Sequence, residues 1–470
     1  MSYQTALARM YALGHELANA SSHKFDLAHM RVLLTALNHP ERKFPGVLIA
    51  GTNGKGSTAA TLASILRASG LRTGLYTSPH LVRINERIRI SGDEISDDEF
   101  ALLHDVVDRT AERLVEDGEL PWHPSFFEML TAIAFEYFAQ NKVEIAVLEV
   151  GMGGRLDATN VIEPRVSVIT DISLDHQKFL GNTVAEIARE KAGIIRPGGV
   201  VVTLPQHPQA NDVIGHAILE LGAQGVSAVP YVPPVSPGSA EYLMRTADSA
   251  AERGKNAAPS GRQKNYETDA RPFSCYPLQI MGKQISVETP LVGRHQLRNI
   301  ALAIATAEVL SHQGFAITPE TIERGIRETR WSGRFQILAA EGGAPEFVFD
   351  VAHNPAGAWA LRSTLSACYE DRPLTFVFGA MRDKAIGEMA EILFPLAVRV
   401  IATRADNPRS ATPDEIREAA ARMSTDIEDA ADVASALDRA RSLAGSRGVV
   451  VVTGSIYIVG EAMPALGVKV

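Results

Sequence analysis

The chain has 470 residues, of which 46% are hydrophobic and 21% charged, and this composition is typical of a globular protein with more than one core. The formal net charge of −9 argues against a general binder of nucleic acid or of acidic membranes, because such partners need a positive protein surface. No apolar run is long enough to span a membrane, and two cysteines, Cys275 and Cys368, cannot form a disulfide framework or a cysteine-rich metal site.

The first twenty residues, MSYQTALARMYALGHELANA, have no basic end followed by an apolar stretch. That combination marks a signal peptide, so none is expected here. Together with the low cysteine content, this predicts a cytoplasmic protein that interacts with neither membranes nor nucleic acid.

Short β-branched runs then alternate with longer helical patterns. In the first block the strand candidates are GVLIA (46–50), RTGLYTS (72–78), EIAVLEV (144–150), RVSVIT (165–170) and GVVVTL (199–204), with helical patterns at 57–69 and 126–140. In the second block they are FVFDVA (347–352), LTFVFGA (374–380), VRVIAT (398–403) and GVVVVTG (448–454). Apolar strands that alternate with helices indicate a parallel sheet covered on both faces. Two α/β domains are therefore expected.

The two blocks are separated by a change of composition. Residues 230–274 are rich in Pro, Ser, Ala and charge and have no sustained apolar period, which predicts a long, mobile surface insertion. A solvated loop without a function is the simplest interpretation of it. A helical pattern resumes within LVGRHQLRNIALAIATAEVL (291–310), so we place the boundary near 291–298. The expected domains are 1–293 and 294–470.

The stretch GTNGKGST (51–58) follows the first strand candidate and opens a helical pattern. It differs from the usual phosphate-loop pattern, because Ile49 stands where the first Gly is expected and Gly56 separates Lys55 from Ser57. Its placement nevertheless directs backbone N–H groups and a helix dipole at one point. Lys55 could reach the outer phosphates of a nucleotide, and the Ser57 hydroxyl could bind Mg²⁺. A glycine-rich turn with an incidental lysine is the alternative.

A carboxylate is expected to share such a cation. Glu149 ends the strand candidate EIAVLEV and is followed by a sharp turn, GMGGR. Ligands collect at the carboxyl ends of parallel strands, so Glu149 and Ser57 are expected to meet there. Without Lys55 upstream, Glu149 would be interpreted as an ordinary acidic residue at the end of a strand.

Other polar residues are less distinctive by themselves. His176 follows a strand candidate and Lys191 lies within a helical pattern, and in isolation both are more typical of structural roles. In RINERIRI (83–90), Arg83, Arg87 and Arg89 lie close together. They could attract an anionic substrate tail or form a solvated strand face.

Taken together, the motifs resemble those of the Mur ligase superfamily and, within it, the folylpolyglutamate synthase/dihydrofolate synthase family. Peptide-adding Mur ligases typically carry Thr at the position of Gly56, so the loop is similar to that of the folate branch. The other matching stretches are YTSPHL (76–81), FFEMLTAIAF (126–135), EVGMGGRLDATN (149–160), DHQKFLGNTVAEIAREKAGI (175–194), GRHQLRNIALA (293–303), WSGRFQ (331–336), DVAHNP (350–355) and FGAMRDKA (378–385). The insertion at 230–274 looks longer than the family usually shows.

The resemblance implies an N-terminal P-loop ATPase domain with a parallel-rich sheet and a smaller, Rossmann-like C-terminal domain, with ATP and Mg²⁺ as cofactors. Ser57 and Glu149 would hold one Mg²⁺, His176 would ligate a second, and Lys191 would be the carbamylated lysine of the family. The loop residues expected to contact ATP are Gly51, Thr52, Asn53, Gly54, Lys55, Gly56, Ser57 and Thr58.

The resemblance also implies roles in the second block. Asn299 would contact the adenine side of ATP, and Arg334 would contact the phosphates. Asp350 and His353 would face the reacting groups and the incoming amino acid. Lys55, His176, Lys191, Asp350 and His353 are thus the expected catalytic residues.

The implied reaction joins L-glutamate to dihydropteroate or to the glutamate tail of a reduced folate through an acyl phosphate, in a monomeric enzyme. GGRLDATN resembles the form found in bifunctional enzymes, in which Arg155 and Asp157 would contribute to pterin binding. Two alternatives stay open. One is a Mur-type ligase that acts on a nucleotide-linked cell-wall peptide, and the other is a non-catalytic nucleotide-binding module.

Overall fold

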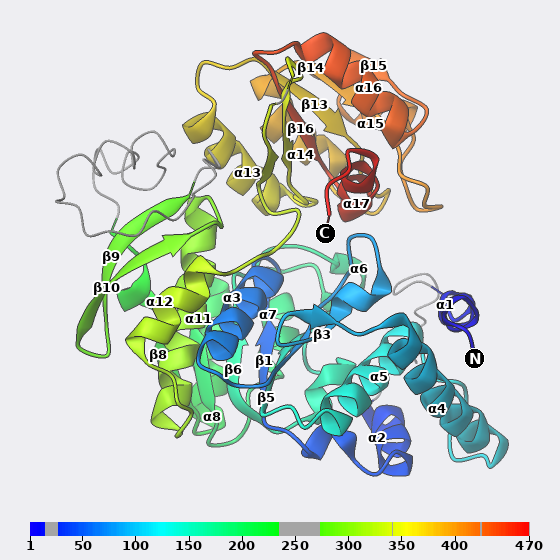
Figure 1. Cartoon of the computed structure of the whole chain (residues 1–470), viewed down its shortest axis with the longest axis vertical. Helices are drawn as coiled ribbons and strands as arrows, with labels where there is room; N and C mark the ends of the chain where they lie inside the picture. Colours follow the sequence, from blue (N-terminus) through cyan, green and yellow to red (C-terminus); the bar gives the residue numbers. More distant parts are fainter. Residues whose placement is uncertain (15–26, 235–272, 341, 424, 470) are drawn as a thin grey trace, which may run out of the picture. The chain divides into compact units, whose positions relative to one another are not determined.

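The structure is a computed structural model that describes residues 1–14, 27–234, 273–340, 342–423 and 425–469. The described residues form two compact units, each built around its own sheet (Figure 1). Unit 1 contains the described residues of Met1–Val232, Gln279–Ile285 and Arg298–Glu328. Unit 2 contains those of Pro233–Leu278, Ser286–Leu297 and Thr329–Val470.

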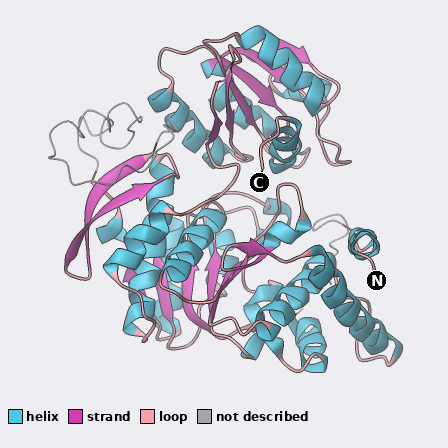
Figure 2. Cartoon of the chain, viewed as in Figure 1, coloured by secondary structure: helices cyan, strands magenta, loops and turns pink. Residues whose placement is uncertain are grey.

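Unit 1 contains an eight-stranded sheet flanked by helices (Figure 2). In spatial order its strands are β4 (Asp93–Glu94), β3 (Ile88–Ile90), β2 (Thr73–Tyr76), β5 (Ile145–Glu149), β1 (Gly46–Ala50), β6 (Pro164–Ile169), β7 (Val200–Thr203) and β8 (Gln224–Ser227). In this spatial order, the neighbouring strands β2, β5, β1, β6, β7 and β8 all pair in parallel. At the β2 edge, β3 pairs antiparallel with β2, and β4 pairs antiparallel with β3. Both β1 and β5 are buried along their whole length, which explains their continuous apolar sequences.

Capping residues begin several helices of unit 1. Ser96, Ser125 and Thr183 precede α4, α5 and α7, and each forms a capping box with a Glu three residues later. The helices are α1 (Tyr3–Ala12), α2 (Leu27–Ala36), α3 (Lys55–Ala68), α4 (Asp97–Glu116), α5 (Phe126–Gln140), α6 (Gln177–Leu180), α7 (Val184–Ala192), α8 (Pro208–Glu220), α11 (Arg294–His312) and α12 (Pro319–Arg327), with short 3₁₀ turns η1 (Pro40–Arg42), η2 (Ile84–Arg87), η3 (Ala158–Val161) and η4 (Val229–Tyr231).

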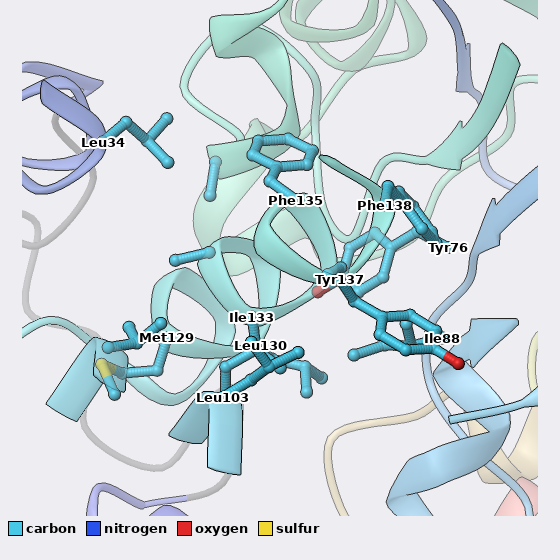
Figure 3. Close-up of a cluster of buried hydrophobic side chains, with 14 of the residues drawn as sticks. Leu34, Tyr76, Ile88, Leu103, Met129, Leu130, Ile133, Phe135, Tyr137 and Phe138 are labelled. Carbon is cyan, nitrogen blue, oxygen red and sulfur yellow. The ribbon is translucent and has the colours of Figure 1, made fainter. Parts of the chain in front are cut away.

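The largest apolar cluster of unit 1 surrounds α5 (Figure 3). This helix is apolar around most of its circumference, and Met129, Ile133 and Phe135 are fully buried. The side chains that Figure 3 labels come from α2, β2, β3, α4 and α5: Leu34, Tyr76, Ile88, Leu103, Met129, Leu130, Ile133, Phe135, Tyr137 and Phe138. Each fully buried large side chain stabilises the fold by about 1.5–3 kcal/mol. The cluster therefore anchors the β2–β5 side of the sheet.

Helices α3 and α12 pack closely because α12 carries Gly325. A Cβ atom on Gly325 would lie 2.4 Å from the Ile65 Cα, and the Ser64 hydroxyl donates a 2.7 Å hydrogen bond to the Gly325 carbonyl. We expect Gly325→Ala to push the helices apart and to lower the free energy of unfolding by about 1–3 kcal/mol. Denaturant unfolding measures this. Gly215→Ala on α8 is the control, because a Cβ there meets nothing within 4 Å; equal effects would contradict the prediction.

The His104 side chain of α4 is fully buried, and no described residue hydrogen-bonds its ring nitrogens. Burial lowers the pKa of the imidazole, and the nearby Asp108 carboxylate opposes this shift. As the pH falls below about 6.5, the unfolded chain therefore binds a proton that the folded chain excludes, and stability is lost.

We expect His104→Leu to remove this pH dependence and to raise the free energy of unfolding at neutral pH by about 1 kcal/mol. Urea unfolding of both proteins at about pH 5 and about pH 8 tests the expectation. An unchanged loss of stability in the acid range would contradict it.

Unit 2 contains a six-stranded sheet. In spatial order its strands are β11 (Gln336–Leu338), β12 (Glu346–Phe349), β16 (Val449–Thr453), β13 (Leu374–Phe378), β14 (Ala397–Ala402) and β15 (Ile427–Asp429). All pairs are parallel except β11 with β12. The helices are α13 (Pro355–Cys368), α14 (Ile386–Leu393), α15 (Pro413–Ala419), α16 (Val433–Ala444) and α17 (Ile456–Ala465), with a 3₁₀ turn η6 (Phe394–Leu396). A separate hairpin joins β9 (Ser274–Ile280) and β10 (Lys283–Thr289).

The predicted fold class is confirmed, with two α/β units and parallel-rich sheets. All nine predicted strands are present, and α5 has the predicted bounds. The units divide the chain differently from the predicted ranges 1–293 and 294–470, because residues 298–328 group with unit 1. Their packing on α3 explains this. Residues 235–272 of the predicted insertion lie outside the described residues. Within the described residues, no helix combines the length and apolarity that a membrane span needs.

Candidate active site

The loop 51–58 connects β1 to α3, and two glycines determine its shape. Gly54 has a φ of +88°, and a Cβ there would lie 2.1 Å from the Asn299 Oδ1. Gly51 has a φ of +157°, and a Cβ there would lie 1.8 Å from the Thr170 Oγ1. Side chains are thus excluded at both positions. Helix α3 begins at Lys55, so its first N–H groups and its positive dipole end face the loop. This arrangement suits a bound phosphate chain.

The loop is held by the segment that follows β6. The Asp171 carbonyl accepts hydrogen bonds from the N–H groups of Thr52 (2.8 Å) and Asn53 (3.2 Å). The Thr52 hydroxyl donates to the Ser173 carbonyl (3.0 Å) and accepts from the Ser173 N–H (3.1 Å). Neither Asp171 nor Ser173 was among the residues predicted from the sequence. The available signal was their position directly after a predicted parallel strand.

Lys55 and Glu149 lie close together at this edge of the sheet. The meeting of Ser57 with Glu149 stays a prediction. The Lys55 Nζ lies 4.0 Å from the Glu149 Oε1 and donates to the Thr52 carbonyl at 3.4 Å. Glu149 is buried, and its other oxygen accepts a hydrogen bond from the Ser78 N–H (3.2 Å). Ser57 is buried in the first turn of α3.

This donor set fits Mg²⁺. The ion usually takes one or two carboxylates, with water and substrate phosphates completing its shell. Glu149 and the Ser57 hydroxyl are donors of this kind beside a phosphate cradle. Among the described residues there is no cluster of three or more His, Cys, Asp or Glu side chains that could hold a metal by themselves.

Lys191, on α7, lies beneath the loop. Its side chain is buried, and its Nζ donates a 2.8 Å hydrogen bond to the Gly51 carbonyl. Burial and the charge of Lys55 together lower the pKa of the amine to about 7, although Asp175 and Asp157 oppose the shift. A substantial fraction of the amine is therefore neutral near physiological pH. A neutral amine is nucleophilic, and an ordinary surface lysine is not.

His176 precedes α6 in a left-handed conformation, with a φ of +50°. Its backbone N–H donates to the Asp175 Oδ1 (2.8 Å), and Nε2 of its ring lies 3.9 Å from the Asp175 Oδ2. The Asp175 carboxylate thus lies beside the imidazole. Asp175 was not among the residues predicted from the sequence.

The Asp157 carboxylate is directed into its own loop. One oxygen accepts from the N–H groups of Gly151 (2.9 Å) and Met152 (3.1 Å), and the other accepts from the N–H (3.0 Å) and hydroxyl (2.5 Å) of Thr159. Burial raises its pKa, and these hydrogen bonds oppose the rise. Asp157 thus organises the loop after β5. Arg155 lies on this loop and pairs with Glu190 of α7 (3.0 Å).

Asn299, on α11, is buried against the loop in unit 1. Its side chain lies beside Gly54, and its backbone carbonyl accepts a hydrogen bond from the Thr58 hydroxyl (3.4 Å). Asn299 therefore lies next to the phosphate loop, and its predicted contact with the adenine side of ATP stays a prediction. Of the three arginines in RINERIRI, Arg87 is buried and donates to the His80 Nδ1 (2.8 Å), so the segment is not a uniformly solvated face.

In unit 2, Asp350 follows β12 at the carboxyl edge of the sheet. Its carboxylate accepts hydrogen bonds from the N–H groups of Phe335 (2.9 Å) and Ala352 (2.9 Å). Burial raises the pKa of Asp350, and the charge of nearby Arg334 opposes the rise. The His353 Nδ1 donates to the Val351 carbonyl (2.9 Å), so Nε2 is the basic nitrogen of the neutral ring. Arg334 and His353 therefore both lie near enough to Asp350 to influence its carboxylate, and the predicted roles of the three residues stay predictions.

Comparison with known proteins gives a consistent result. Family models match residues 126–224 as a Mur ligase middle domain and 333–456 as a Mur ligase glutamate ligase domain. The dihydrofolate synthase/folylpolyglutamate synthase of Bacillus subtilis is 34% identical over 440 residues, which cover 93% of each chain.

Solved structures match along the whole chain. The Mycobacterium tuberculosis folylpolyglutamate synthase complexed with ADP and AMPPCP has a TM-score of 0.82 at 30% identity, with 99% of each chain covered. The E. coli FolC structure in complex with DHPP and ADP has a TM-score of 0.77 at 27% identity, with 99% of this chain and 98% of that chain covered. The chain therefore belongs to the folylpolyglutamate synthase/dihydrofolate synthase family of the Mur ligase superfamily and is an ATP-dependent ligase.

Proposed function

We propose that this ligase joins L-glutamate to dihydropteroate and to the glutamate tail of reduced folates. The observation that carries this proposal is Lys191, a buried amine with a pKa near 7 that is hydrogen-bonded to the phosphate loop. A nucleotide switch needs the loop, but it has no need of such an amine beside it. The relatives named dihydrofolate synthase/folylpolyglutamate synthase support the choice of substrates.

The chemistry requires ATP as a co-substrate, because oxide is too poor a leaving group for a carboxylate to form an amide directly. Transfer of the terminal phosphate to the carboxylate gives an acyl phosphate, and attack by the amine of glutamate then releases phosphate. Catalysis of the first step is mainly positioning and neutralisation of charge. We assign these tasks to the loop 51–58 and Lys55 in unit 1 and to Arg334 in unit 2.

Ser57 and Glu149 would hold Mg²⁺, with His176 as ligand of a second ion, and bound Mg²⁺ supplies neutralisation of phosphate charge. We assign the carbamylated lysine to Lys191, since CO₂ reacts with a neutral amine. The carbamate is an anion, and it suits a position next to Lys55 and the cation site better than a buried ammonium does.

The second step needs a neutral amine on glutamate. In the neutral His353 ring, Nε2 is basic, and the raised pKa of Asp350 makes its carboxylate a better proton acceptor than an ordinary aspartate. We assign removal of the ammonium proton to this pair. Asn299 is assigned to the adenine side of ATP, and Arg155 and Asp157 to the pterin side, where Asp157 acts by shaping the loop.

We further propose that the enzyme acts as a monomer in the cytoplasm. The low cysteine content supports a reducing compartment. Gel filtration with light scattering tests the oligomeric state.

The function is tested by ADP release with Mg²⁺-ATP and L-glutamate, comparing 7,8-dihydropteroate with a reduced folate and identifying products by mass. Turnover of both, each gaining one glutamyl group, is expected. Turnover of the reduced folate alone would remove dihydropteroate from the proposal. Turnover of only a nucleotide-linked peptide would indicate a cell-wall ligase, and nucleotide binding without glutamate-dependent ADP release would indicate a non-catalytic module.

A further inference from the structure

An ion pair adjacent to the phosphate loop is used by none of the roles assigned above. Arg298, on α11, binds the Asp171 carboxylate in a bidentate manner, with Nη2 2.7 Å from Oδ1 and Nε 3.3 Å from Oδ2. The same Nη2 donates to the Pro205 carbonyl at 2.9 Å. Bidentate arginine–carboxylate pairs fix orientation more strongly than single contacts do. The pair thus connects α11 to the segments that follow β6 and β7.

Both partners are joined to the nucleotide loop through their neighbours. The Asp171 carbonyl accepts the N–H groups of Thr52 and Asn53, at the start of the loop. The residue after Arg298 is Asn299, which lies against Gly54 and accepts the Thr58 hydroxyl, at the end of the loop. The ion pair therefore connects Asp171, which holds the start of the loop, to the helix residue next to Asn299, which contacts the end of the loop.

The charges of the pair are also relevant. The Asp171 side chain is 41% exposed, and its main chain holds the loop expected to receive the phosphates. A carboxylate at this position would repel a polyphosphate through the solvent. Arg298, whose side chain is 31% exposed, neutralises it.

We propose that Asp171 and Arg298 are positioning residues for the nucleotide. The pair keeps Asn299 in position against the phosphate loop. Within the pair, Arg298 neutralises the negative charge of Asp171 beside the phosphates. The inference rests on the proposed function, since it assumes that ATP binds at this loop.

The test is the dissociation constant of Mg²⁺-ADP, measured by calorimetry on the full chain. We expect Arg298→Ala to weaken binding about tenfold, which corresponds to about 1.4 kcal/mol, because it breaks the link and leaves a bare carboxylate. Asp171→Asn should have a smaller effect, since Arg298 keeps its positive charge. The double variant should bind more tightly than Arg298→Ala alone, because the repulsive charge is gone.

A matched control comes from the other end of α3. Arg67 and Glu328 form a pair of similar exposure, with a separation of 3.4 Å. Arg67→Ala should leave nucleotide binding unchanged. Arg298→Lys keeps the positive charge but cannot make the bidentate contact. Its dissociation constant for Mg²⁺-ADP should therefore lie between those of wild type and Arg298→Ala. In steady-state assays the KM for ATP should rise in Arg298→Ala, while the KM for glutamate stays constant.

Binding by Arg298→Ala within about twofold of wild type, or an equal loss in Arg67→Ala, would overturn the inference while the proposed function stands. A double variant that shows the product of the two single effects would also overturn it, because independent residues combine in that way. Failure of the wild-type protein to bind Mg²⁺-ADP would instead overturn the proposed function, and this inference with it.

Discussion

Lys55→Ala is expected to lower kcat/KM for ATP by about a hundredfold to a thousandfold, which is the usual effect of losing one preorganised group that stabilises transition-state charge. The Lys55 Nζ lies at the start of α3, within 4.0 Å of Glu149 and in contact with the Thr52 carbonyl. A cation at this position stabilises the negative charge that develops on the phosphate in the transition state. Alanine removes this cation and adds no bulk. Steady-state ADP release measures the effect.

Two controls separate chemistry from folding in this experiment. Thermal unfolding of Lys55→Ala should resemble that of wild type, because the side chain is not part of the apolar core. Lys43→Ala, on the exposed residue after η1, should retain full activity. Wild-type turnover in Lys55→Ala would refute the assignment of the loop.

Lys191→Arg is expected to abolish most glutamate ligation, with a loss of at least about a hundredfold by analogy with the removal of other essential polar groups. Arginine keeps a positive charge at all relevant pH values and cannot form a carbamate. It would place a permanent cation in a buried position next to Lys55. ADP release at saturating substrates measures the loss, and near-native activity would contradict carbamylation.

The pKa of Lys191 gives this prediction a pH dependence. Because the amine has a pKa of about 7, its neutral fraction falls as the pH drops below that value, and CO₂ reacts only with the neutral form. Activity should therefore decline on the acid side and be restored in part by added bicarbonate. Carbon-13 spectroscopy with labelled CO₂ should show one carbamate in wild type and lose it in Lys191→Arg. Equal activity in CO₂-free and bicarbonate-containing buffer, without a carbamate signal, would exclude the modification.

Local sequence rules were sufficient for the two-block α/β fold, whereas the roles of most site residues came from the family resemblance and stay predictions. Strands such as β1 and β5 are buried on both faces, so their apolar runs are continuous and easily recognised. Each capping box places a Ser or Thr and a Glu three residues apart, which is local information. The rule that ligands collect at the carboxyl ends of parallel strands predicted that Glu149 lies near Ser57. In the structure Lys55, two residues before Ser57, lies 4.0 Å from Glu149.

The tertiary structure decided the contacts between residues far apart in the chain, since no periodicity encodes them. Asp171 and Arg298 are separated by 127 positions, and only the folded structure brings α11 next to the segment that follows β6. Residues 298–328 group with unit 1, and one of their close contacts is that of Gly325 with Ile65. Asp157 was expected to face a pterin, and its position shows four hydrogen bonds to its own loop.

Lys191 illustrates the division most clearly. The sequence determined that a lysine lies near the end of a helix, and family resemblance supplied its expected role. Its lowered pKa arises from burial beneath the Gly51 carbonyl and from the charge of Lys55, 136 positions away in the chain. Burial and electrostatic interaction depend on distances in space. The identity of the reactive groups was therefore readable from the sequence, but their protonation was set by the folded structure.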